Sequence, residues 1–173
     1  YYGRRRASVI VLQTNDPARR SYGTIERYRQ CGIAVQSVAA RDEMRLALER
    51  VERFDHLLID TPSLPVDSTA AAAFADSVRA IVQDVVPLHV QLVLDASRVV
   101  SDATLTAWKS LSLRPASAAV THLDESHQWG RFAEWLMALG LPYGYASEDP
   151  AVPGGLASLS ASRIAEHLCT TNA

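Results

Sequence analysis

The sequence has little cysteine, almost no lysine and no long apolar run, and each shortage excludes a class of protein. Its 173 residues include only two cysteines, Cys31 and Cys169, whose spacing fits no metal motif and which are too few for a disulfide scaffold. We therefore expect buried or inert thiols. No apolar stretch reaches the roughly 18 residues that a membrane-spanning helix needs, so no such helix is predicted. Lys109 is the single lysine of the chain.

The charge balance gives no strong nucleic-acid signal. Lys and Arg total 17 against 19 Asp and Glu, a formal net charge of −2, whereas general nucleic-acid binders are strongly basic. The first 53 residues carry eleven arginines and six acids, and the remainder carries six bases and thirteen acids. With 48% hydrophobic residues, the chain predicts a single folded domain over residues 1–173. Because it opens with a segment typical of a helix end and a turn, we expect this domain to be incomplete at its N-terminus.

Apolar runs alternate with segments of helical period, which predicts an α/β fold: three layers, with a mostly parallel sheet and helices on both of its faces. Continuous apolar runs such as residues 9–12 and 57–59 suit strands that are buried on both faces. The expected strands are Ser8–Thr14, Ala34–Val38, His56–Asp60, Val90–Ala96, Ala118–His122 and Tyr143–Ser147. The expected helices are Tyr22–Gln30, Asp42–Arg53, Ser68–Gln83, Ser101–Leu111, a helix between Ser126 and Gly140, and Ala157–Leu168.

The helix between Ser126 and Gly140 has the clearest pattern. Ser126 is a plausible N-cap and Gly140 a C-cap. An apolar stripe at i, i+3, i+4 spacing is expected to face the core and contains Trp129, Phe132, Ala133, Leu136 and Met137. Trp135 falls off this stripe, so we expect it to be a contact residue at the surface.

Polar residues follow several of the expected strands, at the end of a parallel sheet where ligands bind. Asp60 and Asp124 each come at or just after the end of an apolar strand, and Asp95 with Ser97 follows another. An unpaired acid is costly to bury, so such residues usually point into a polar crevice. The alternative is that each acid caps the next helix. Because two acids, Asp60 and Asp124, stand at matching places in one sheet, a ligand-binding site is favoured over helix capping.

Two of these segments resemble motifs of the signal-recognition-particle class of GTPases. Residues 54–61, F-D-H-L-L-I-D-T, are similar to the strand and D-T-A-G turn of that class, and residues 121–125, T-H-L-D-E, are similar to its guanine-reading T-K-L-D-E motif. Gly130, residues 140–142 and residues 152–153 follow in the order and spacing found in its flagellar-targeting branch, the FlhF proteins. The resemblance covers nearly the whole chain, and the order of the motifs supports it more than any single motif.

The resemblance implies a P-loop G domain whose first strand is missing. The phosphate-binding loop G-x-x-x-x-G-K-[ST], whose amides and lysine hold the phosphates, does not occur in the sequence. In this class that strand lies in the middle of the sheet, so its absence would leave unpaired backbone groups on both sides. Lys109 lies in an expected helix away from any glycine-rich loop and offers no substitute.

The same resemblance assigns roles to individual residues. Asp60 would help to hold Mg²⁺, and Asp124 would accept hydrogen bonds from the guanine edge. Asp16 with Arg19 or Arg20 corresponds loosely to the segment that activates water. The full set of implied nucleotide contacts comprises Asp60, Thr61, Thr121, His122, Asp124 and Ser147, and the implied catalytic set comprises Asp16, Arg19 and Arg20.

Several positions depart from the motifs of the class. Pro62 has no N–H and Ser63 replaces the glycine whose amide would approach the terminal phosphate, which puts phosphate sensing in doubt. His122 replaces a lysine whose stem packs along the base. Glu148 and Asp149 bring negative charge close to where an anionic ligand would lie, which opposes nucleotide binding.

The implied function is GTP-linked targeting of flagellar or membrane proteins. GTP with Mg²⁺ would be the ligand in a parent protein that retains the phosphate loop, and this chain alone is expected to bind it weakly. The implied partners are a second G domain across the nucleotide, as a homodimer or with a related protein, and components of the membrane or the flagellar base. The implied location is cytoplasmic, peripheral at the inner membrane or the cell pole.

Two alternatives remain open. The degraded motifs fit a pseudo-GTPase that keeps the fold as a protein-interaction module. The first 85 residues are also similar to a response-regulator receiver domain with Asp60 as phospho-acceptor, although a receiver would be shorter and would carry a lysine where His122 stands.

Overall fold

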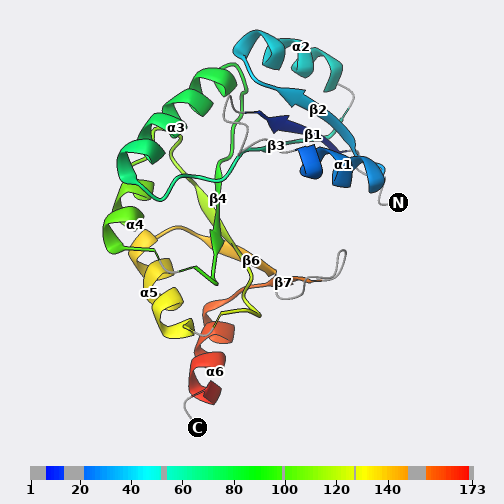
Figure 1. Cartoon of the computed structure of the whole chain (residues 1–173). Helices are drawn as coiled ribbons and strands as arrows, with labels where there is room; N and C mark the ends of the chain where they lie inside the picture. Colours follow the sequence, from blue (N-terminus) through cyan, green and yellow to red (C-terminus); the bar gives the residue numbers. More distant parts are fainter. Residues whose placement is uncertain are drawn as a thin grey trace. The chain divides into compact units, whose positions relative to one another are not determined.

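The predicted α/β fold is confirmed by the computed structural model of the chain, which describes residues 7–13, 22–51, 54–98, 100–126, 128–147 and 155–171. Strands and helices alternate along the chain (Figure 1). The strands are β1 (Ala7–Leu12), β2 (Ala34–Val38), β3 (His56–Asp60), β4 (Gln91–Asp95), β5 (Ser117–Thr121), β6 (Tyr143–Ser147) and β7 (Leu156–Ser158). The helices are α1 (Tyr22–Gln30), α2 (Arg41–Val51), α3 (Ser68–Val82), α4 (Asp102–Lys109), α5 (Trp129–Leu139) and α6 (Ala161–Thr171).

The strands are divided between two sheets, one in each of two compact units. The first unit comprises Tyr1–Pro65 and Phe74–Val86, and the second comprises Val66–Ala73 and Pro87–Ala173. In the first, the order is β2-β1-β3 and both pairings are parallel. In the second, the order is β4-β5-β6-β7, with β7 antiparallel to β6. The sequence did not predict β7, and because residues 156–158 form that strand, α6 begins at Ala161 instead of Ala157.

The core of the first unit is built around β1. Residues 9–12 are at most 1% exposed, as expected for a strand with neighbours on both edges and helices on both faces. Val9 and Val11 pack with Ile25 of α1, and α2 buries Met44 and two further apolar side chains. Figure 1 shows α1 and α2 on opposite sides of this sheet.

The expectation that residues 57–59 are buried on both faces is wrong. Among the described residues β3 pairs with β1 alone, and so it lies at an edge of its three-stranded sheet. Leu58 is 58% exposed. The strand β4 lies at an edge of its sheet in the same way, since the described part of the chain pairs it with β5 alone, and its Val93 is 60% exposed. Apolar composition alone could not distinguish an edge strand from a central one.

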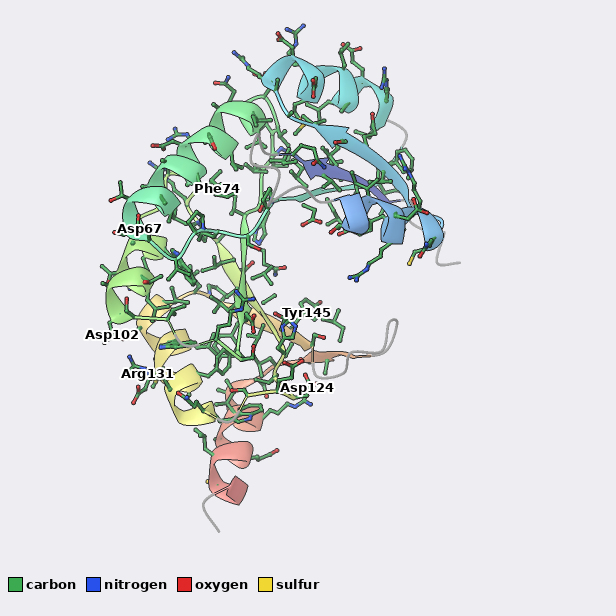
Figure 2. The ribbon with its side chains drawn as sticks, viewed as in Figure 1. Asp67, Phe74, Asp102, Asp124, Arg131 and Tyr145 are labelled. Carbon is green, nitrogen blue, oxygen red and sulfur yellow. The ribbon has the colours of Figure 1, made fainter. Side chains whose placement is uncertain are left out.

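In the second unit the helices cover one face of the sheet. Along β4, β5 and β6, buried residues alternate with more exposed ones. The buried residues are Leu92, Leu94, Ala118, Val120 and Ala146. Helix α5 packs against both α4 and α6. On the other face, Val93 and Tyr145 lie in one row across the strands through their pairings with Ala119, and Tyr145 is 55% exposed (Figure 2).

Helix α5 corrects three of the sequence expectations. Gly140 is the C-cap, with φ 63°, as predicted, but the N-cap is Gln128 and not Ser126. Trp135 is buried at 4% exposed, whereas Met137 is 73% exposed. The helix turns its Phe132, Trp135, Leu136 and Leu139 side inward, a stripe one position away from the predicted one, because it packs against two neighbouring helices.

Two further findings concern the shortages in the sequence. Cys31 and Cys169 are free and exposed, so of the expected buried or inert thiols the buried alternative is wrong, and inertness stays a prediction. Within the described ranges, no helix is long and apolar enough to cross a membrane.

Candidate functional site

The polar residues after β4, β5 and β6 form one cluster in the second unit. The backbone of Ala96 donates to Thr121 O at 2.9 Å, and Leu123 donates to Ser147 O at 3.1 Å. These bonds continue the sheet beyond its strands and fix the loop that follows β5. Three of the residues implied by the resemblance, Thr121, His122 and Ser147, are thereby held at the ends of adjacent strands.

Asp124 is presented to solvent by this loop. It is exposed, and it follows Leu123, which is 1% exposed and anchors the loop in the core (Figure 2). Helix α5 begins at Trp129 with Gln128 as its N-cap, so Asp124 does not cap it. The helix-capping alternative is therefore wrong for this residue, and the structure leaves its side chain exposed.

His122 has an unusual backbone conformation. Its φ of 55° lies in the left-handed region, which costs a non-glycine residue on the order of 1–3 kcal/mol and often occurs at functional sites. Its Nδ1 lies 3.1 Å from Thr121 Oγ1 and 3.5 Å from Asp95 Oδ1. These contacts hold the ring at the ends of β5 and β4. The lysine of the related motif would place an unbranched side chain there instead of a ring.

Asp95 is the acid of the cluster that has side-chain partners within it. Burial raises the pKa of this carboxyl, but hydrogen bonds from Ser97 and the nearby His122 and Arg98 outweigh it, so that the net pKa lies below its usual value. Ser97 Oγ donates at 2.6 Å, and Arg98 Nε lies 2.9 Å away. Sequence analysis had noted Asp95 with Ser97 but not their contact with His122, because that contact depends on the pairing of β4 with β5.

Asp60 lies in the first unit, at the end of β3. Tyr28 of α1 donates its hydroxyl to Asp60 Oδ2 at 3.3 Å. Burial raises the pKa of the Asp60 carboxyl, and the bond from Tyr28 offsets part of that rise. The next helix, α3, is capped by Asp67, which accepts a bond from the Ala70 amide at 2.8 Å. Asp60 is therefore a partly desolvated carboxyl with a local donor and not a helix cap.

Tyr28 was missed by the sequence analysis. It precedes Asp60 by 32 residues, and no motif connects the two. It meets the carboxylate because Val11 of β1 pairs with Asp60 and α1 covers the same sheet. Burial and the Asp60 charge raise the pKa of the Tyr28 hydroxyl above its usual value.

Of the other implied site residues, the structure describes only some. Asp16, Arg19 and Arg20 lie outside the described residues. Thr61 is exposed directly after β3. In the part of the chain that the structure describes, no three His, Cys, Asp or Glu side chains gather as a metal site would require.

The single lysine is engaged elsewhere. Lys109, the last residue of α4, donates from Nζ to Ala138 O at 2.7 Å, and so ties α4 to the last turn of α5. A small cavity of about 80 Å³ lies beside α5 and is lined by residues that include Ser126, Arg131 and Trp135. That volume is well below the roughly 300 Å³ at which ligand pockets usually begin.

Comparison with known proteins gives a fold and no closer relative. No protein-family profile matches the chain, and no curated sequence is significantly similar to it. Among solved structures, FlhF complexed with GTP and Mg²⁺ superposes with a TM-score of 0.76 at 16% identity, covering 95% of this chain and 62% of FlhF. Chloroplast FtsY from Physcomitrella patens gives a TM-score of 0.69 at 18% identity, covering 94% and 56% of the two chains.

The 54 kDa signal recognition particle protein from Aeropyrum pernix K1, in complex with GDP, gives a TM-score of 0.68 at 19% identity. It is covered over 40% of its length, against 95% of this chain. The chain therefore spans less than two thirds of each of these three proteins. Taken together with the mostly parallel sheets and the strand-end loops, these superpositions show that the chain has the fold of the signal-recognition-particle class of GTPases, FlhF among them.

Proposed function

We propose that the chain is the base-reading part of a GTP-binding G domain that acts in protein targeting, with flagellar biogenesis as its setting. The observation that carries the proposal is the position of Asp124. Its carboxylate is exposed on a loop fixed by two backbone bonds at the strand ends, and it caps no helix. A carboxylate in this position can accept two N–H bonds from the edge of a guanine, whereas adenine presents the wrong donors there.

The neighbouring residues would complete the base site. His122, held by Thr121 and Asp95, offers an aromatic ring that can lie against a base, and Ser147 offers a hydroxyl at the next strand end.

Asp60 with Thr61 would face the Mg²⁺ side of the nucleotide, where Asp16, Arg19 and Arg20 would orient water. A carboxyl that is partly desolvated, as Asp60 is, gains from a nearby cation.

Tight binding of GTP would need a phosphate loop that this sequence does not contain. Lys109, the single lysine of the chain, offers no substitute, and its Nζ donates to Ala138 O. In a protein that supplies the loop, the domain would bind GTP with Mg²⁺, pair with a second G domain across the nucleotide, and work at the inner membrane or the cell pole as a peripheral protein.

A pseudo-GTPase that serves as an interaction module is the second candidate. Thr61 is followed by the buried Pro62, which has no N–H, and by Ser63 in place of the glycine of the phosphate-sensing turn. These substitutions in the turn would weaken GTP hydrolysis and would leave the base site unaffected. The two candidates share the fold and differ in catalysis.

The test is whether the chain itself binds guanosine in preference to adenosine, because recognition of the base requires no contact with phosphates. Two charge-assisted hydrogen bonds contribute about 3–6 kcal/mol together, and a Kd of about 1 mM corresponds to about −4.1 kcal/mol. We expect guanosine to shift the amide NMR signals of residues 121–126 at millimolar concentration, and adenosine to leave them unchanged. GTP should not bind at micromolar concentration.

The informative variant is Asp124→Asn, with Glu125→Gln as a matched control because it neutralises the adjacent exposed acid. Asp124→Asn should weaken guanosine binding about tenfold or more and favour xanthosine, which presents an acceptor where guanosine presents a donor. Glu125→Gln should change neither. An unchanged preference in Asp124→Asn would remove the support for a guanine site.

A further inference from the structure

The imidazole of His122 is held by side chains from the ends of β4 and β5, both in the second unit. Thr121, the last residue of β5, aligns with Asp95, the last residue of β4. His122 Nδ1 lies 3.1 Å from Thr121 Oγ1 and 3.5 Å from Asp95 Oδ1. The left-handed backbone of His122, with φ 55°, persists in a residue other than glycine only where the surrounding structure fixes it. These two contacts are therefore candidates for what fixes it.

The hydrogen bonds of Thr121 identify which nitrogen of His122 carries a hydrogen. A threonine hydroxyl has a single proton to donate. Leu94 O, which can only accept, takes a bond from Thr121 Oγ1 at 3.3 Å. Because its proton is directed at Leu94 O, Thr121 Oγ1 can only accept a bond from the imidazole. Nδ1 of His122 is therefore the protonated nitrogen, and it donates to Thr121.

Asp95 supports the same assignment independently. Burial raises the pKa of its carboxyl, but bonds from Ser97 and the charges of His122 and Arg98 lower it on balance, so the group is an anion at neutral pH. An unprotonated Nδ1 would turn its lone pair toward this anion, whereas Nδ1–H is attracted to it. The distance of 3.5 Å is longer than the usual 2.7–3.2 Å of an N–H···O bond. Thr121 thus makes the hydrogen bond, and Asp95 acts through its charge.

We infer that Thr121 is a positioning residue for the loop that carries Asp124, and that with Asp95 it holds the His122 imidazole in its Nδ1–H form. In the neutral ring the other nitrogen, Nε2, is then an unprotonated acceptor, and the exposed Asp124 carboxylate on the same loop is also an acceptor. The loop therefore suits a ligand edge rich in N–H donors, as the guanine edge is. This inference rests on the proposed function, and it assigns Thr121 to the support of His122, whereas the resemblance implies a contact with the nucleotide.

The second acceptor on this loop depends on the histidine. A lysine ammonium, which the related motif has at this position, carries three donors and no acceptor. Asparagine tolerates the left-handed backbone, so His122→Asn removes the ring and keeps a residue that suits the loop. This variant identifies the NMR signals of the His122 ring among those of the five histidines in the chain.

The first experiment is long-range ¹H–¹⁵N correlation NMR of the unliganded 173-residue chain, at about pH 8, where an ordinary imidazole is neutral. We expect the Nδ1–H form of His122 in the wild type and in Thr121→Ser, which keeps the hydroxyl. Thr121→Val, of the same shape without the hydroxyl, should populate the Nε2–H form. Thr106→Val is the matched control, because it also removes a hydroxyl that donates to a backbone oxygen, Asp102 O at 2.9 Å, and it should change nothing. An Nε2–H ring in the wild type, or an unchanged Nδ1–H ring in Thr121→Val, would overturn the inference.

The second experiment measures guanosine binding by the same proteins. Thr121→Val should weaken it about two- to tenfold, as the loss of one neutral hydrogen bond would, whereas Thr121→Ser and Thr106→Val should retain the wild-type affinity. An unchanged affinity in Thr121→Val, with the ring in its Nε2–H form, would overturn the positioning role and leave the guanine site intact. Failure of the wild type to bind guanosine, with its ring in the Nδ1–H form, would refute the proposed function and still support the hold of Thr121 on His122.

Discussion

Lys109 is expected to stabilise the second unit and to take no part in ligand binding. Its Nζ donates to Ala138 O at 2.7 Å, one of the last carbonyls of α5, which have no partner within the helix. The substitution Lys109→Met keeps the length of the side chain and removes the charge and the donors. The loss should therefore fall on the contact between α4 and the end of α5.

The size of the effect follows from three opposing contributions. A hydrogen bond from a charged group contributes about 1.5–3 kcal/mol, and a cation at a helix C-terminus adds about 0.3–1 kcal/mol. Ordering a lysine side chain costs up to about 2 kcal/mol, and Lys109 is exposed, which weakens the electrostatic contributions further. The expected net loss in the free energy of unfolding is about 1 kcal/mol, or roughly 2–4 °C in Tm for a chain of this length.

Urea unfolding followed by circular dichroism measures this loss. Lys109→Arg, which keeps a cation and its donors, should retain most of the stability. Arg79→Met, which removes an exposed cation from the last turn of α3, should have an effect within about 0.5 kcal/mol. Unchanged stability in Lys109→Met would show that the bond to Ala138 contributes nothing. Weaker guanosine binding in this variant, at unchanged stability, would place the lysine in a ligand site and refute the reasoning.

Three other predictions concern the core and Asp60. Phe132→Ala should lower the free energy of unfolding by about 3–5 kcal/mol, because the ring is 1% exposed and leaves a cavity; a loss below about 1 kcal/mol in urea unfolding would contradict that packing. Burial raises the pKa of Asp60 in the folded state, so its favourable contribution is complete at low pH and is lost as pH rises through the folded pKa. Asp60→Asn should therefore gain stability relative to the wild type as pH rises above about 4; a variant that loses stability relative to the wild type over that range would contradict the sign. Finally, a small-molecule phosphodonor with Mg²⁺ should leave the intact mass of the chain unchanged; one added phosphate that disappears in Asp60→Asn would favour the receiver alternative.

The sequence by itself determined the kinds of elements and most of their positions. Periodicity located β2, β3, β6 and α1 at their observed bounds, because alternation between continuous apolar runs and helical spacing is a local property of the chain. Gly140 ended α5 as expected because a left-handed C-cap favours glycine. The T-H-L-D-E segment predicted the loop whose Asp124 stands at the end of β5, since a strand followed by a short polar loop is likewise a local pattern.

The tertiary structure alone decided which residues meet and which remain exposed. Leu58 is apolar like a core residue and is nevertheless exposed, because burial depends on strand neighbours and the described residues give β3 only β1 as a neighbour. Trp135 is buried and Met137 exposed because α4 and α6 select the inward side of α5. The contacts of Asp60 with Tyr28 and of Asp95 with His122 join residues far apart in sequence. Such contacts are set by strand order and register, which depend on the whole fold and have no signature within a single segment.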